Sequence, residues 1–502
     1  MDALRPNFTP APVVKTLINI GALLDVPTGF ILECRFGEHV INGGLATFTG
    51  VVGIGNNFKT TVMDHMSFTA LARTQESTGS DYDTEVNKHE HQISDGRIRT
   101  VHDLLGEDVL MTGRWIHTDK TVYSGNEWYA QQKEFLENKV KNSKVLSRDT
   151  PFWNRERTGF MQMLVPTITS VDSFTEFETD DVIDMQDKNE LGDSGGNTIH
   201  MRQGLAKLRF LMEAPRLNGA AYNYLLMTAH IGKESTMQNA GPGGQVPVKK
   251  LATLKHGDKI KGTTDKFTFV THNCWQCFDS KAITADDRMG PKWPKDEFDR
   301  AKDEQDLKEV KITLLRGKSG PSGQNISIIV SQREGVKADL TEFNHCKTLG
   351  NFGFEGNNTT YSLSLMPEVK LMRTTVRGLF DTNPRLRRAM NITSEILQMT
   401  YLWPQWRDLY CTMKELYDDI KALGYDWDML LDTRGWWTYN NHLQDVQFLS
   451  SFDLLRMRKK LYVPYWLTDE QVPAAVKDVV RPDQAFYLES LKKHRAQLKK
   501  AA

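Results

Sequence analysis

The stretch from Gly53 to Thr61 constrains the fold more than any other part of the chain. The apolar, β-branched run at 46–52 before it is typical of a buried strand, and the apolar spacing at 62–73 after it is helical. Strand, glycine-containing loop, Lys-Thr and helix is the layout of a phosphate-binding P-loop. In such a loop the backbone N–H groups cradle phosphates, Lys59 contacts phosphate oxygens and Thr60 ligates Mg²⁺. The predicted binding residues are Gly53, Gly55, Asn56, Asn57, Phe58, Lys59, Thr60 and Thr61.

One position departs from the P-loop pattern, because Phe58 stands where a second glycine is expected. The alternative interpretation of this stretch is a strand, turn and helix without chemical meaning. Motifs elsewhere in the chain are needed to choose between a phosphate-binding loop and a turn without chemical meaning.

Composition restricts the class of protein. A chain of 502 residues predicts more than one domain. With a net charge of -1, binding to nucleic acid would have to come from a local basic patch. Five cysteines are an odd, sparse set, which favours a reducing compartment without a disulfide framework. No signal-peptide pattern and no run of about 18 apolar residues is found, so we expect a cytoplasmic protein that does not associate with membranes.

Strand and helix patterns alternate over the first half of the chain. Strands are expected at 46–52, 109–117, 160–173 and 222–230, and helices at 62–73, 128–140 and 205–212. Such alternation predicts an α/β fold with a mostly parallel sheet and helices on both faces. A β-hairpin is expected from 311–316 and 326–332.

The composition changes near 373–383 to long, aromatic-rich helical patterns. We therefore predict an N-terminal segment (1–40), an α/β core (41–375) and a helical C-terminal domain (376–502).

A nucleotide hydrolase also needs acids, one to hold Mg²⁺ and one to activate water. Asp172 ends the apolar run at 160–173 and is the predicted Mg²⁺ partner of Thr60. Glu85 follows the P-loop helix and is the predicted catalytic carboxylate. The carboxyl ends of parallel strands meet at one edge of a sheet, so both acids can face the phosphates. The alternative for each is a surface acid at a strand end, and 80–85 is poor strand material.

The order of these motifs resembles the RecA-type recombinases, closest to the tailed-phage UvsX branch, from about residue 18 to about 335. Tyr82 to Glu85 resembles the segment that carries the catalytic glutamate. That branch also tolerates a Phe-Lys ending of the P-loop, as in Phe58-Lys59. Trp115 to Thr118 and Val171 to Ser173 follow in the same order. Nothing comparable covers 376–502.

The resemblance implies a RecA-like P-loop ATPase core that uses ATP and Mg²⁺. It also implies that the protein assembles on single-stranded DNA as a homo-oligomer, with a filament favoured over a ring. The assembly would promote homologous pairing and strand exchange. Further partners would be a single-strand-binding or loader protein, and a phage-encoded protein would act in the host cytoplasm.

The resemblance assigns several residue roles. His230 falls where these proteins carry a polar switch residue that senses the γ-phosphate. Arg316 and Lys318 fall where a basic pair reaches the ATP of the neighbouring protomer, although an ordinary hairpin turn is the alternative. Leu191 to Ser194 is similar to the start of the first DNA-binding loop, and Phe8 to Ala11 to a tether between protomers.

The segment from 231 to 266 corresponds, on this interpretation, to the second DNA-binding loop. Glycines permit close approach of the backbone and lysines neutralise phosphates. The predicted DNA-binding residues are Gly243, Gly244, Lys249, Lys250, Lys255, Lys259 and Lys261. The alternative is a solvated loop, and an aromatic residue for base stacking is missing until Phe267 and Phe269, which we expect in the next strand.

Three other hypotheses remain open. A DnaB-type hexameric helicase shares such a core, and 320–323 resembles its later strands, but no N-terminal collar domain fits before residue 40. A structural or scaffolding protein with a decayed P-loop would explain Phe58. Cys274 and Cys277 with His272, and the pair His345-Cys346, could form a zinc site, with buried thiols as the alternative.

Overall fold

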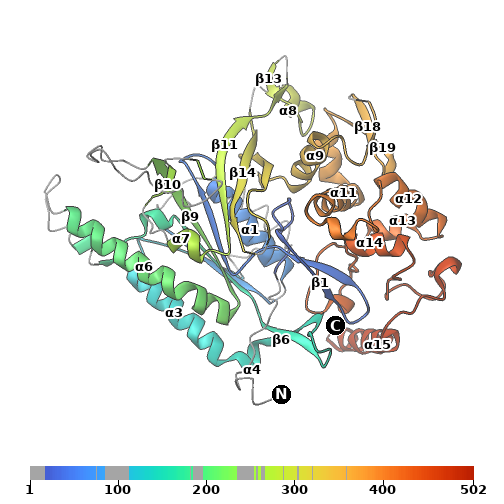
Figure 1. The fold of residues 1–502 in the computed structure, drawn as a ribbon, viewed down its shortest axis with the longest axis horizontal. Helices are drawn as coiled ribbons and strands as arrows, with labels where there is room; N and C mark the ends of the chain where they lie inside the picture. Colours follow the sequence, from blue (N-terminus) through green and yellow to red (C-terminus); the bar gives the residue numbers. More distant parts are fainter. Residues whose placement is uncertain are drawn as a thin grey trace.

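The fold is organised around a ten-stranded sheet with the order β16-β15-β14-β11-β3-β9-β8-β4-β5, to which β10 adds on β9 (Figure 1). The computed structural model describes residues 17–74, 76–84, 112–180, 182–184, 196–233, 254–255, 258–261, 266–285, 288–301, 305–318, 320–357 and 359–501. The strands are β3 (Phe48–Gly53), β4 (Thr78–Asp83), β5 (Trp115–Asp119), β8 (Thr167–Asp172), β9 (Asn223–Lys233), β10 (Asp258–Ile260), β11 (Asn273–Ala282), β14 (Leu307–Gly317), β15 (Asn325–Ser331) and β16 (Gly335–Val336). The stretch from β11 to β5 is parallel throughout, whereas β14, β15, β16 and β10 pair antiparallel. The predicted α/β class with a mostly parallel sheet is confirmed.

Helices cover both faces of this sheet. Helix α1 (Lys59–Arg73) packs on one face, and α3 (Gly125–Lys141), α6 (Gly196–Ala221) and α7 (Lys266–Val270) pack on the other (Figure 1). Alternation along β3 produces this arrangement, since Val51 joins the core beneath α1 and Val52 joins the core beneath α6. A capping box begins α3, with Ser124 and Glu127 each bonded to the other's backbone N–H.

Two apolar runs form other elements than the single strands that the sequence predicts. The run at 160–173 forms two strands, β7 (Phe160–Leu164), which pairs with β6 (Ser147–Trp153), and β8. Pro166 lies between them and has no N–H to donate to a ladder. The run Phe267–Thr271, predicted as a strand, contains the short helix α7, and the strand starts only at Asn273.

Strand β4 forms even though its residues are polar. Its Asp81 pairs with His117 of β5 at 2.7 Å, and the hydroxyl of Tyr82 donates to the carbonyl of Tyr123 at 2.8 Å. Polar side chains are unfavourable in a buried strand unless they have partners, and neighbouring elements provide partners for Asp81 and Tyr82. Of the strand expected at 109–117, residues 109–111 lie outside the described residues, and β5 begins at Trp115.

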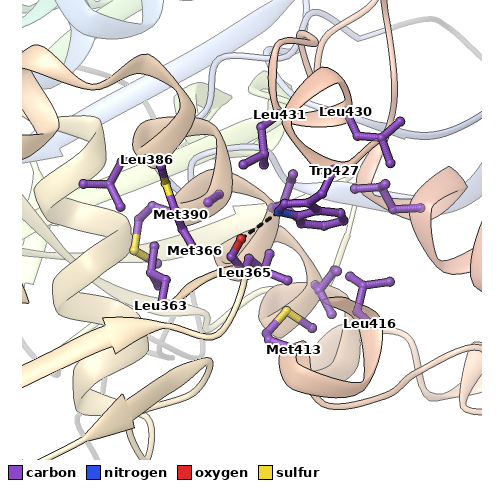
Figure 2. Close-up of a cluster of buried hydrophobic side chains, with 14 of the residues drawn as sticks. Leu363, Leu365, Met366, Leu386, Met390, Met413, Leu416, Trp427, Leu430 and Leu431 are labelled. Carbon is purple, nitrogen blue, oxygen red and sulfur yellow. Dashed lines mark hydrogen bonds between the residues drawn. The ribbon is translucent and has the colours of Figure 1, made fainter. Parts of the chain in front are cut away.

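A second core lies beyond the β15 side of the sheet. It is built by α9 (Ala338–Thr348), β17 (Phe354–Gly356), β18 (Thr360–Leu363), β19 (Met366–Met372), α10 (Val376–Thr382), α11 (Pro384–Leu402), α12 (Met413–Ala422), α13 (Trp427–Leu431) and α14 (Ser451–Arg458). Figure 2 shows its centre, where the indole of Trp427 donates to the carbonyl of Leu365 at 2.7 Å among leucine and methionine side chains. Ile329 of β15 packs into this core with Leu340 of α9, so the helical region is continuous with the sheet.

The remaining elements lie at the periphery or are short. They are the hairpin β1 (Pro27–Glu33) and β2 (His39–Gly43), α4 (Ser143–Leu146), β12 (Thr284–Ala285), β13 (Arg288–Pro291), α8 (Glu297–Ala301) and α15 (Gln484–Ala501). None of the helices within the described ranges has both the length and the apolar character needed to cross a bilayer.

Candidate nucleotide-binding site

Of the two glycines in the loop between β3 and α1, only Gly53 lies where a larger side chain does not fit. A Cβ atom added to Gly53 would lie 2.5 Å from the carbonyl oxygen of Cys277 on the adjacent β11, so a larger residue would displace backbone. A Cβ on Gly55 would meet nothing within 4 Å. Residues 54–56 are exposed at this end of the sheet.

Phe58 adopts a left-handed backbone conformation that glycine adopts more readily than other residues. Its φ of 57° is left-handed, and its carbonyl accepts the N–H of Val62 at 3.0 Å to begin α1. A left-handed residue other than glycine costs about 1–2 kcal/mol. The partly buried Phe58 ring packs against the core beneath α1, which offsets part of this cost. The chain therefore enters α1 directly from a left-handed residue at Phe58.

Asn57 fixes the loop to β11. Its Nδ2 donates to the carbonyl of Cys277 at 3.4 Å, and the hydroxyl of Ser280 donates to its Oδ1 at 3.1 Å.

Thr60 and Asp172 meet directly below the loop. The hydroxyl of Thr60 donates to Asp172 Oδ2 at 2.6 Å, and the hydroxyl of Thr228 on β9 donates to Asp172 Oδ1 at 2.5 Å. Lys59 Nζ donates to the carbonyl of Ile54 at 3.0 Å, which keeps the ammonium group over the loop. The predicted Lys59, Thr60 and Asp172 are thus brought together, and Thr61 is buried in α1 behind them.

The oxygens of Thr60 and Asp172 fit a magnesium ion. Mg²⁺ in nucleotide sites is usually held by one or two carboxylates together with substrate phosphates and water, and rarely by a full set of protein ligands. Within the described residues no group of three or more His, Cys, Asp or Glu side chains could hold a metal ion.

The zinc hypothesis is wrong for the cysteines. Cys274 and Cys277 project into the cores on opposite faces of β11, and Cys346 is buried in the helical region. Burial raises the pKa of the Cys274 and Cys277 thiols to about 12. All three are buried free thiols, the alternative that the sequence had left open.

Glu85 lies outside the described residues, but the chain that leads to it is held beside Asp172. Asp83 is opposite Asp172 in the parallel pair of β4 and β8. The N–H of Thr84 donates to the carbonyl of Asp172 at 2.7 Å, and the hydroxyl of Thr84 donates to the carbonyl of Ser173 at 2.9 Å. The catalytic role of Glu85 stays a prediction.

His230 stands between the loop and the lysine-rich segment. Its Nδ1 is 3.5 Å from Lys59 Nζ, and its carbonyl accepts the N–H of Lys261 at 2.7 Å. The N–H of His230 donates to the hydroxyl of Thr175 at 2.9 Å, and the same hydroxyl donates to the carbonyl of Lys261 at 3.2 Å. Thr175 follows Asp172 by three residues, so the end of the Asp172 strand joins the same network.

The described part of the lysine-rich segment folds back on β9. In the antiparallel pair of β10 and β9, Lys259 lies opposite Gly232 and Asp258 opposite Lys233. Lys255, Lys259 and Lys261 are exposed. The other predicted DNA-binding residues, Gly243, Gly244, Lys249 and Lys250, lie outside the described residues, as do Leu191 to Ser194 and Phe8 to Ala11.

Arg316 and Lys318 lie toward the opposite edge of the sheet from the loop. Arg316 pairs with Cys274, which is itself level with Gly50 in the middle of β3. The N–H of Lys318 donates to the carbonyl of His272, level with Phe48 at the start of β3. At about 3.3 Å per residue, these positions are roughly 10 and 17 Å along the sheet from Gly53.

Sequence reasoning missed three hydroxyl residues of this site, Thr84, Thr175 and Thr228. Thr84 directly follows β4, Thr175 lies three residues after Asp172, and Thr228 lies within β9 two residues before His230. Their closeness in sequence to predicted functional residues was the only signal available. No protein-family model matches the chain, and no curated protein matches it. The resemblance to RecA-type recombinases therefore stays a prediction.

Proposed function

We propose that this protein is a DNA-dependent ATPase with a RecA-like core, which assembles on single-stranded DNA and promotes homologous pairing and strand exchange. One observation carries the proposal. His230 is 3.5 Å from the ammonium group of Lys59, and its own carbonyl holds the N–H of Lys261. A single residue thus connects the phosphate loop to the lysine-rich segment.

The residues divide the chemistry as follows. The exposed loop N–H groups, the N-terminus of α1 and Lys59 hold the phosphates of ATP. Thr60 and Asp172 hold Mg²⁺, and Thr228 orients the Asp172 carboxylate. Glu85, the residue after Thr84 in the sequence, activates the attacking water. Bound Mg²⁺ supplies neutralisation of phosphate charge.

DNA binding follows from the exposed lysines Lys255, Lys259 and Lys261. They neutralise backbone phosphates, so binding is independent of sequence and weakens as salt rises. A change at the γ-phosphate reaches Lys59 first, then His230, and then Lys261 through one peptide group. Thr175 links the same peptide to the Asp172 strand.

The positions of Arg316 and Lys318 favour a head-to-tail assembly. They lie away from the P-loop edge of their own chain, so they reach phosphates only in a second copy stacked on that edge. A heterologous contact of this kind builds a filament or closes into a ring. We propose the filament. Rings in electron micrographs would point to the hexameric helicase instead.

The direct test compares ATP turnover with and without single-stranded DNA for the wild type, His230→Ala and a control, His345→Ala, on α9. We expect DNA to stimulate the wild type and the control, and to lose most of its effect on His230→Ala. Displacement of a labelled strand from a homologous duplex tests strand exchange in the same preparations. Full DNA stimulation of His230→Ala would contradict the proposal, and no hydrolysis by the wild type would favour the scaffolding alternative.

A further inference from the structure

An exposed aromatic ring sits among three cations beyond the lysine-rich segment. Phe269 of α7 is 59% exposed. Lys266 Nζ lies 5.2 Å from the centre of its ring, Arg316 Cζ 5.5 Å and Lys318 Nζ 5.8 Å. A cation–π contact of significant energy occurs roughly once in 70–80 residues, so three cations around one exposed ring are unusual.

The cluster carries net positive charge. Within the described residues, no carboxylate forms an ion pair with Lys266, Arg316 or Lys318. The pKa of Lys318 is lowered by partial burial and by the neighbouring charge of Arg316. An anion beside the ring would relieve this repulsion.

The ring stands on a fixed base. Phe267, two residues before Phe269 on α7, is completely buried and stacks against Phe174 at a centroid distance of 6.1 Å. The N–H of Thr271 donates to the carbonyl of Phe267, and the N–H of Lys318 donates to the carbonyl of His272. The helix that carries Phe269 and the strand end that carries two of its cations are therefore tied together. The backbone that carries the ring is therefore held in place before a ligand arrives.

We propose that Phe269 is a stacking platform for a base of single-stranded DNA, and that Lys266 neutralises the adjacent phosphate. An exposed aromatic ring within a cationic surface is the usual means of binding single strands without sequence preference. The inference rests on the proposed function and adds to it the aromatic contact that the lysine-rich segment itself lacks. Arg316 and Lys318 also lie near this ring, with Arg316 Cζ 5.5 Å and Lys318 Nζ 5.8 Å from its centre. The DNA platform is therefore next to the pair assigned to the neighbour's nucleotide.

The test measures binding of the full-length protein to a fluorescent oligothymidylate by anisotropy, without nucleotide, for the wild type and Phe269→Ala. The control is Phe298→Ala, a change at a ring on α8 that is 83% exposed. Alanine removal of a stacked base contact weakens binding roughly 5- to 150-fold. We expect a loss of this size for Phe269→Ala, recovery in Phe269→Trp, and no change for the control.

An abasic oligonucleotide of the same length separates stacking from charge. Because it has no bases to stack, Phe269→Ala should bind it as the wild type does. Lys266→Gln should weaken binding to both oligonucleotides and reduce the slope of log affinity against log salt by about 0.7.

Three results would overturn the inference. Equal DNA affinity of Phe269→Ala and Phe298→Ala would remove the platform while leaving the proposed function intact. Unchanged DNA affinity together with slower DNA-independent ATP turnover in Phe269→Ala would assign the ring to the neighbour's nucleotide. A wild type that binds no single-stranded DNA would overturn the inference and the proposed function together.

Discussion

Replacing Thr228 by valine isolates the support that β9 gives to the predicted magnesium site. The hydroxyl of Thr228 is completely buried and donates to Asp172 Oδ1 at 2.5 Å, opposite the bond from Thr60 to Oδ2. Valine has nearly the same shape but cannot donate, so one oxygen of the carboxylate loses its partner. The carboxylate then is no longer fixed in the orientation that holds Mg²⁺.

The expected size follows from the type of bond. Loss of a hydrogen bond to a charged group costs about 1.5–3 kcal/mol, and loss of an outer partner of a metal-binding residue typically costs about 10- to 100-fold in metal affinity. We therefore expect the Mg²⁺ concentration for half-maximal ATP turnover to rise about 10- to 100-fold in Thr228→Val. Most of the turnover should return at high Mg²⁺, because the residues that contact the phosphates are unchanged.

The assay is ATP turnover across a Mg²⁺ titration, with thermal unfolding measured in parallel. Thr49→Val is the matched control, since it makes the same change at a buried site on β3, where the hydroxyl donates to the carbonyl of Ala46 at 3.3 Å. The reasoning would be refuted if a folded Thr228→Val showed the Mg²⁺ dependence of the wild type and the control.

Three further predictions test the loop, a buried acid and the assembly. Gly53→Ala should lower the free energy of unfolding by about 1–3 kcal/mol, because its Cβ would press on the carbonyl of Cys277. Gly55→Ala has open space around its Cβ and should leave thermal unfolding unchanged. Equal effects of the two substitutions would contradict the loop geometry. Burial raises the pKa of Glu38 to about 8, so the folded state keeps a proton that the unfolded state releases near pH 4.5. Stability should therefore fall as pH rises from about 5 to 8.5. Glu38→Gln should flatten this part of the curve of melting temperature against pH, and an unchanged slope would count against the burial of the charge. Mixing Lys59→Ala with Arg316→Ala should restore the ATP turnover that each variant lacks alone. A head-to-tail contact would pair the intact loop of the Arg316→Ala copy with the intact arginine of the Lys59→Ala copy. No recovery in mixtures that co-assemble would exclude that contact.

Local patterns in the sequence predicted the elements around the site. Alternating strands and helices predicted the mostly parallel sheet, and β3, the loop and α1 follow the expected layout. The hairpin of β14 and β15 also forms as expected. These features depend on residues that are close together in the sequence, so a single sequence is enough to predict them.

The remaining features depend on contacts between distant segments. β4 forms because Asp81 finds His117 on another strand, which no local propensity reveals. The helix at α7 forms because Phe267 is buried against Phe174 while Phe269 faces outward. A strand would instead have given these two residues, two positions apart, the same face. The hydroxyl of Thr175 acquires its role only when β9 and β10 meet above it.

We propose one phosphate site that drives hydrolysis and responds to single-stranded DNA. The most direct measurement is ATP turnover with and without single-stranded DNA, at low and moderate salt, for the wild type, Lys59→Ala and Glu85→Gln. We expect turnover that DNA stimulates, that weakens as salt rises, and that both substitutions abolish. Turnover that persists in Lys59→Ala, or that single-stranded DNA does not change at either salt concentration, would contradict this proposal.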